Sequence, residues 1–496
     1  MPEYAPAAAF TRSQEAFAQI EEWLDGPGAA RLEHAALEEQ LEARGREMLR
    51  LLLQDHLDLR SAREQRHEGV TGPDGIARTR AEAGHSRPLS SVFGQVTVSR
   101  IAYRAPGARN VHPADAELNL PREKHSHGLS GKVASGAARG SFAQACADVA
   151  RQTGSKLGKR QAGQLTRRAA ADFEDFYASE EHRPPPGAAP GDVLALSCDG
   201  KGIVILPGQM RPETARKARK AVPKQDGRLS RGEVRNRKRM AETGAVFDIT
   251  PVPRTAEEIL DPPRPRPPAP RARNKWVTAS VAADAATVVA SVFAEADRRD
   301  PDRRRTWIAL ADGNVHQLDR IRAEAAARNT GITIICDLIH VIEYLWTAAW
   351  SFFPEASPEA GPWVRGHAAA ILDGHATAVA AAIRDAITAA GPPLSKAQRQ
   401  AAAKTAGYLD AKAPYLDYPT ALAAGWPISS GVIEGTCRHL VKDRMDITGA
   451  RWGVSTAEAV LKLRALHANG HFDAYWTYHL QRERERNHGR SYDLAA

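Results

Sequence analysis

Three short apolar runs, each leading into an aspartate, constrain the fold of this chain more than any other feature. The runs are DVLALSCDG, TWIALADG and GITIICDLIH, and their aspartates are Asp199, Asp312 and Asp337. Apolar runs of this length without polar alternation are typical of strands buried on both faces, as in parallel sheets. Helix-like segments at about 286–298 and 317–328 separate the later strands. The pattern predicts a mixed α/β sheet with buried parallel members.

Length and composition narrow the class of protein. A chain of 496 residues is too long for one compact core, so we expect two to four domains. No run approaches the roughly 18 apolar residues of a membrane helix, and the N-terminus has no signal-peptide pattern. The four cysteines are far apart without a CxxC pair, which argues against a zinc cluster or a disulfide framework. We therefore expect a cytoplasmic protein with no membrane contact.

Positive charge is concentrated in one segment. Residues 211–239 contain twelve Lys and Arg against three acidic residues, a local excess that equals the +9 of the whole chain. Such concentration suits a polyanionic partner, although a solvated basic loop with no partner would look the same.

The N-terminal third is mainly helical in pattern. Apolar residues recur at helical spacing between 13 and 66, as in a helical hairpin that either packs on a core or forms a dimer contact. A strand pair is expected around Gly94. From 130 to 173 a helix, a break near Gly154 and a second basic helix containing Lys159 and Arg160 have the shape of a helix-turn-helix, or of an ordinary basic hairpin.

A late acidic residue completes a possible metal site. Glu434 follows the break Gly425-Trp426-Pro427, and Ser429 or Ser430 is a natural N-cap for its helix. Carboxylates from separate elements can hold two Mg²⁺ ions about 4 Å apart for phosphoryl transfer. Buried carboxylates are costly and often functional, but ordinary strand-end or capping carboxylates would give the same pattern.

Four blocks of sequence resemble a known family. LSCDGKGIVI, ALADGNVHQLDRI, ICDLIHVIEYLW and SSGVIEGTCRHLVKDRMDITGARW look like the catalytic blocks of bacterial insertion-sequence transposases of the ISKra type and, more distantly, of Mutator-like transposases. The match covers about 192–452. The resemblance implies an RNase H-like fold whose catalytic and metal-binding triad is Asp199, Asp312 and Glu434, holding two ions of Mg²⁺ or Mn²⁺.

Asp337 and His340 complicate the triad. Mutator-like relatives carry a similar Cys/Asp-x-x-His motif, which implies an accessory pair near the site. Two alternatives remain open: Asp337 is the second catalytic carboxylate in place of Asp312, or it caps the next helix while His340 is a core histidine.

The resemblance also sets the expected organisation and activity. We expect a helical region at 1–80; a strand pair with a helix-turn-helix-like DNA-binding domain at 81–180; the first part of an RNase H-like core at 190–345, with a basic insertion at 207–242; a helical insertion at 346–425; and the end of the core with a C-terminal tail at 426–496. The expected activity is cleavage and strand transfer of DNA by a nucleoid-associated homodimer or larger oligomer bound to terminal inverted repeats and target DNA. An RNase H-like nuclease without joining activity, or an inactive, domesticated DNA-binding derivative, is the alternative.

Several residues are expected to contact DNA. Basic side chains would bind phosphates, and one tryptophan would either stack on an unpaired base or anchor the core. They are Lys159, Arg160, Arg216, Lys217, Arg219, Lys220, Arg235, Arg237, Lys238, Arg239, Lys442, Arg444, Arg451 and Trp452.

Overall fold

The computed structural model describes residues 9–179, 187–189, 191–220, 237–265, 267–389, 394–447 and 449–489. Contacts divide the chain into two compact units, Met1–His182 with Gly470–Ala496, and Arg183–Asn469. From the sequence we grouped residues 426–496 with the core, whereas the contacts group the last helix with the N-terminal unit.

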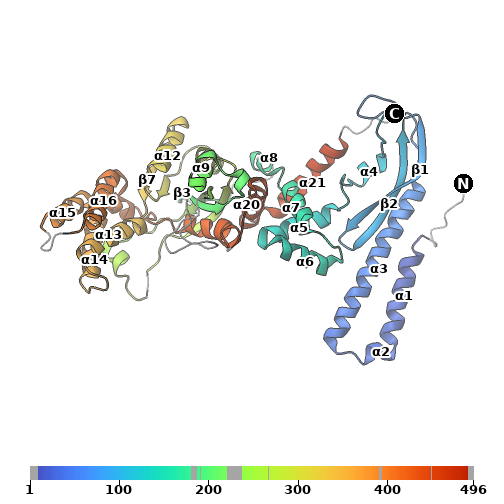
Figure 1. Cartoon of the computed structure of the whole chain (residues 1–496), viewed down its shortest axis with the longest axis horizontal. Coiled ribbons are helices and arrows are strands. Elements are labelled where there is room, and N and C mark those ends of the chain that lie inside the picture. The colour runs from blue at the N-terminus through green and yellow to red at the C-terminus, as the bar shows by residue number, and fades with distance from the viewer. Residues whose placement is uncertain are drawn as a thin grey trace. The chain divides into compact units, whose positions relative to one another are not determined.

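The first unit begins with a helical hairpin and a two-stranded sheet (Figure 1). The hairpin and the strand pair agree with the sequence-based expectation. Their elements are α1 (Thr11–Asp25), α2 (Pro27–Ala30), α3 (His34–Arg63), β1 (Arg80–Ser91) and β2 (Gly94–Arg104). The strands are antiparallel, and Leu57 of α3 packs with Leu89, Val96 and Val98 in a small core.

The rest of the first unit is helical. Its elements are α4 (Pro113–Glu117), α5 (His127–Arg139), α6 (Phe142–Thr153), α7 (Lys159–Ala169), α8 (Phe173–Ala178) and α21 (Phe472–His488). The expected break falls where α6 ends, because Gly154 adopts a left-handed conformation with φ of 69° that glycine tolerates without strain. Leu129, Val149 and Leu165 join α5, α6 and α7 in one core.

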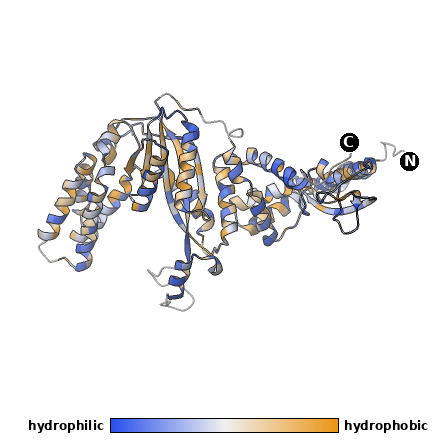
Figure 2. Ribbon diagram, turned by 90° about the horizontal axis from the view of Figure 1, so that it is seen from above, coloured by the Kyte–Doolittle hydropathy of each residue, from blue (hydrophilic) through white to orange (hydrophobic). Residues whose placement is uncertain are grey.

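The second unit contains a five-stranded sheet in the order β5-β4-β3-β6-β7. β3 pairs antiparallel with β4, β4 antiparallel with β5, and β3, β6 and β7 are parallel. The strands are β3 (Val193–Val204), β4 (Lys238–Ile249), β5 (Ala272–Ser280), β6 (Trp307–Ala311) and β7 (Thr333–Cys336). Every residue of β6 is buried, and Figure 2 shows hydrophobic stretches in the centre of this sheet. The expectation of a mixed α/β sheet with buried parallel strands is confirmed.

Helices cover both faces of this sheet. A Cβ on Gly244 would lie 2.3 Å from Val292 of α11 (Ala285–Arg299), while the neighbouring Thr243 contacts Cys437 on the opposite side. Successive strand residues point to opposite faces. Therefore α11 lies on one face, and α18 (Gly431–Thr436) with the π-helical segment Cys437–Lys442 lies on the other.

The remaining elements of the second unit are also helical. They are the 3-10 turns Pro207–Gln209 and Ala413–Tyr415, α9 (Pro212–Lys220), α10 (Ala256–Leu260), α12 (Val315–Ala327), α13 (Leu338–Phe352), α14 (Ala360–Leu372), α15 (Ala376–Ala389), α16 (Lys396–Lys412), α17 (Tyr418–Ala423), α19 (Asp443–Met445) and α20 (Val454–Ala468). The helices α13 to α16 form a group beyond β7, as expected for the segment before Glu434 (Figure 1).

Candidate functional site

The register of the parallel strands places three aspartates in a row. The last paired positions are Ser197 with Leu310 and Ala311 with Cys336. Two residues beyond the Ser197–Leu310 pair, the register sets Asp199 beside Asp312. One residue beyond the Ala311–Cys336 pair, it sets Asp312 beside Asp337. The Asp337 N–H donates to the Ala311 carbonyl at 2.8 Å, which extends the last ladder by one residue. The point on β3 where its pairing with β6 ends, and the carboxyl ends of β6 and β7, therefore share an acidic edge.

Asp199 and Asp312 line one pocket of about 380 Å³ at this edge. Glu242 and Arg320, neither of which we selected from the sequence, line it too. Burial raises the pKa of Glu242, and the positive charge of Arg320 opposes that change. The pocket thus combines several carboxylates with one half-buried cation on α12.

Glu434 groups with Asp337 and His340 rather than with the other two triad members. One possible ligand atom from each of Asp337, His340 and Glu434 lies within 4.8 Å of the others. In the part of the chain that the structure describes, this is the one set of three such side chains that meets this distance, so Asp199, Asp312 and Glu434 do not form a compact set. The expected triad is divided between two neighbouring groups.

Asp337 is fully buried and connects two distant parts of the chain. Its Oδ1 accepts the N–H of Ile339 at 2.7 Å, which caps α13 as one of the alternatives anticipated. Its Oδ2 accepts the N–H of Ser430 at 2.9 Å and also the Ser430 hydroxyl. Ser430 precedes α18, so Asp337 holds the start of the helix that carries Glu434. Ser430 is the N-cap residue, but its hydroxyl serves Asp337 instead of capping α18.

The Asp337–His340 contact has an electrostatic character. The two side chains approach to 3.6 Å between Nδ1 and Oδ2, which is long for a hydrogen bond. The carboxylate raises the pKa of His340 to about 9, against the effect of burial. Burial disfavours the charged form of Asp337, but His340 and Ser430 outweigh it and lower the pKa of this carboxyl. Both groups are therefore charged near neutral pH.

Cys437 is a site residue that the sequence did not reveal. Its thiol donates to Asp199 Oδ2 at 3.1 Å, and Thr243 lies 3.0 Å from the same sulfur. Burial raises the pKa of Cys437 well above its usual range, so the sulfur keeps its proton. Cys437 lies three residues after Glu434, at the start of a π-helical turn, a feature frequent at functional sites. The continuous stretch from α18 into this turn thus contacts Asp199 through Cys437 and lies beside Asp337 through Glu434.

The described part of the expected basic segment has an exposed cationic surface. Arg216, Lys217, Arg219 and Lys220 are exposed on α9, and Arg237 is exposed before β4. Arg235 lies outside the described residues.

Two cations at the start of β4 are engaged within the protein. Lys238 lies 3.4 Å from Asp446. Arg239 donates to the carbonyls of Val281 at 2.6 Å and Ala282 at 3.0 Å, so it serves the fold.

The structure buries two of the residues near Glu434 that were expected to contact DNA. Arg444 and Trp452 are 5% and 6% exposed, with the guanidinium 4.7 Å from the indole centroid. The indole N–H donates to the Met445 carbonyl at 3.0 Å, so Trp452 anchors the core instead of stacking on a base. Neither side chain is accessible to DNA, whereas Lys442 and Arg451 are exposed.

The helix-turn-helix-like segment has an exposed basic face. Lys159 and Arg160 begin α7 and are exposed, as are Arg167 and Arg168 further along. Arg168 pairs with Glu123.

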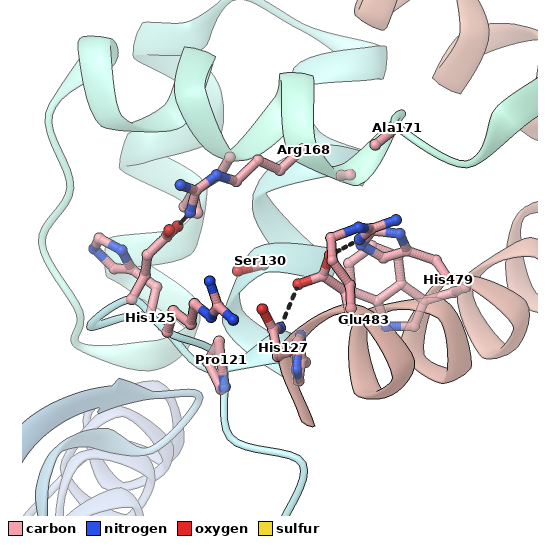
Figure 3. A pocket seen from close by; sticks show the side chains of 15 residues that line it. Pro121, His125, His127, Ser130, Arg168, Ala171, His479 and Glu483 are labelled. Atoms are coloured by element: carbon pink, nitrogen blue, oxygen red, sulfur yellow. Dashed lines mark hydrogen bonds and ion pairs between the residues drawn. The ribbon is translucent and has the colours of Figure 1, made fainter. Parts of the chain in front are cut away.

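A second polar pocket of about 300 Å³ lies in the first unit, between α5, α7 and α21. Figure 3 shows His125, His127, Arg168, His479 and Glu483 around it. Its charges are largely matched, since His479 lies 2.6 Å from Asp172 and Arg168 pairs with Glu123. We interpret this pocket as the polar seam that holds α21 against α5 and α7.

In comparisons with known proteins, no family model and no curated sequence matches this chain. Within the described residues, no helix combines the length and apolar character needed to span a bilayer.

Proposed function

We propose that this chain is a metal-dependent DNA transposase with an RNase H-like core. The observation that carries the proposal is the acidic edge, where Asp199 in β3 lies beside Asp312 and Asp337 at the ends of β6 and β7, and α18 brings Glu434 beside Asp337. The strand order and directions also support an RNase H-like core. The motif resemblance described above supplies the reaction class.

The donor atoms at this edge fit divalent cations. Carboxylate oxygens are the ligands that Mg²⁺ and Mn²⁺ prefer. Because the triad is divided between two groups, we propose two ions, one held by Asp199 and Asp312 and one held by Glu434. When bound, the ions would activate water and stabilise charge on the attacking and leaving oxygens.

The roles of the protein's own side chains follow from their contacts. Cys437 fixes one oxygen of Asp199 by donating a hydrogen bond. Asp337 acts as a positioning residue, because both of its oxygens already accept hydrogen bonds and its links to Ser430 hold α18. This assignment keeps Asp312 as the second catalytic carboxylate. Arg320, beside Asp199 and Asp312, is placed to bind a phosphate of the DNA backbone.

DNA binding is proposed for two exposed basic surfaces, α9 and α7. The first would follow backbone phosphates, and the second would enter the major groove of the terminal repeats. Neutralising phosphates releases counterions, so binding should weaken steeply as salt rises.

The test is cleavage and joining by the purified full-length chain. The substrate is duplex DNA copied from the sequences that flank the coding region, with Mg²⁺ or Mn²⁺ and with an EDTA control. We expect nicking and joining to a target plasmid, and loss of both by at least about 100-fold in Asp199→Asn, Asp312→Asn and Glu434→Gln. Asp319→Asn is the matched control, because Asp319 is an exposed carboxylate on α12 paired with Arg322.

Each alternative predicts a distinct result. Cleavage without joining would identify a nuclease, and DNA binding without cleavage would identify a DNA-binding derivative. Full activity in Asp312→Asn with none in Asp337→Asn would transfer the second catalytic role to Asp337.

A further inference from the structure

One face of the α1–α3 hairpin carries large apolar side chains in contact with solvent. Phe17 and Leu24 of α1 are 51% and 40% exposed. Leu41, Leu49 and Leu52 of α3 are 39%, 39% and 42% exposed. Five exposed large apolar side chains on one helical hairpin are unusual, because exposed apolar residues are ordinarily scattered singly over a protein surface.

Two contacts show how the helices of the hairpin face each other. Arg12 pairs with Asp55 at 2.7 Å, and the Arg44 guanidinium lies 4.1 Å from the Trp23 ring centroid. The two helices are thus antiparallel neighbours, as Figure 1 shows.

The apolar face points away from the β1–β2 sheet. Leu53 and Leu57 of α3 pack into the core that contains the strand residues. At about 3.6 residues per turn, Leu41 and Leu52 lie on a different side of α3, roughly opposite the sheet-facing side. On α1, Phe17 and Leu24 lie next to the residues that face α3, in the direction of increasing residue number around the helix. Leu41 and Leu52 lie in the same rotational direction from the α1-facing side of α3. Because antiparallel helices rotate in opposite senses when viewed from one end, both pairs lie on the same side of the hairpin. Within the described part of the chain, no segment buries this face.

The charges of α3 indicate what would cover the face. Near its start the helix carries the exposed Glu38, and its end carries the exposed Arg63. An antiparallel second copy of α3, related by a two-fold axis between residues 50 and 51, would set Leu49 against Leu52. It would also set Glu38 against Arg63. A parallel copy would oppose like charges instead.

We propose that this face is a self-association surface, formed by two copies of the chain packing their α3 helices antiparallel. A two-fold contact is self-complementary, so one helix supplies both the acidic and the basic end of the match. The leucines form its apolar centre, and the charges fix the direction of packing. The proposal does not rest on DNA cleavage, and it is tested without DNA or metal.

Sedimentation equilibrium of the full-length chain at concentrations up to about 100 µM tests the proposal. We expect a dimer, and a roughly 100-fold or greater weakening in the double variant Leu41→Glu/Leu52→Glu. Ile76→Glu is the matched control, since Ile76 is a 46% exposed apolar residue elsewhere in the same unit. Circular dichroism checks that each variant keeps its helix content. A wild-type monomer throughout this range, or a dimer that the leucine substitutions leave unchanged, would overturn the proposal.

Charge reversal tests the direction of packing separately. Glu38→Arg alone and Arg63→Glu alone should each weaken the dimer by roughly threefold to tenfold, because each sets like charges opposite one another. The double variant Glu38→Arg/Arg63→Glu should restore the wild-type dissociation constant. Additive weakening in the double variant would refute the antiparallel arrangement.

Discussion

Asp337→Ala should release the start of α18 from the sheet edge. The substitution removes the acceptor for three donors: the N–H groups of Ile339 and Ser430 and the Ser430 hydroxyl. The hydroxyl can turn to another acceptor, but the two backbone groups cannot. Leaving the buried Ser430 N–H without a partner costs about 1–3 kcal/mol, and losing the cap on the part-buried Ile339 N–H costs about 0.5–2 kcal/mol, so the two together predict a loss of about 1.5–5 kcal/mol.

Hydrogen exchange measured by mass spectrometry suits this prediction, because a chain with two units has no single unfolding free energy. A local loss of about 3 kcal/mol corresponds to roughly 100-fold faster exchange. We expect this acceleration in peptides that cover 337–341 and 428–436, with little change in peptides from β1 and β2.

Asp417→Ala provides a matched control. Asp417 also caps a helix, accepting the Thr420 N–H at 3.3 Å, but its side chain is exposed and water can replace it. Its removal should cost about 0.5–1 kcal/mol, confined to α17. If Asp337→Ala accelerated exchange no more than Asp417→Ala does in its own helix, the positioning role of Asp337 would be refuted.

Two further predictions concern stability. Trp452→Ala should destabilise the second unit by about 3–5 kcal/mol, because a buried indole is lost, while the DNA affinity of the folded protein stays unchanged. Thermal melting and a DNA-binding titration measure the two effects. A loss of DNA affinity without a loss of stability would support base stacking by Trp452 instead. Burial, with the charge of Arg100, lowers the pKa of His112 to about 4 in the folded chain. Folding therefore favours the neutral imidazole. The contribution of His112 to the free energy of unfolding should be complete above about pH 6.5 and should fall as the pH drops toward 4. His112→Gln should show a smaller drop in melting temperature between pH 7 and pH 5 than the wild type, and an equal drop would contradict this origin.

The sheet and its acidic residues were accessible from sequence because the relevant signals are local. An unbroken apolar run indicates a buried strand, and an aspartate directly after it lies at the strand's carboxyl end. That reasoning placed Asp312 and Asp337 correctly after β6 and β7, whereas Asp199 lies within β3, which continues to Val204. The hairpin and the helix break at Gly154 were likewise predictable from spacing and from one glycine.

The contacts that organise the site were not accessible, because they join residues distant in sequence and carry no local pattern. Ser430 and Asp337 are 93 residues apart, and Cys437 and Asp199 are 238 apart. Arg444 and Trp452 looked like DNA ligands because residue type alone does not report burial. Only the folded chain shows that the indole and the guanidinium pack together.

The division of the acidic residues changes how the site should be understood. A single ion held by Asp199, Asp312 and Glu434 would require ligand atoms closer together than these three side chains are. Glu434 lies on α18, Cys437 begins the π-helical segment that continues from it, and Asp337 fixes the start of α18, so a small shift of α18 would move both groups together. We therefore expect the position of α18 to control how the two acidic groups meet.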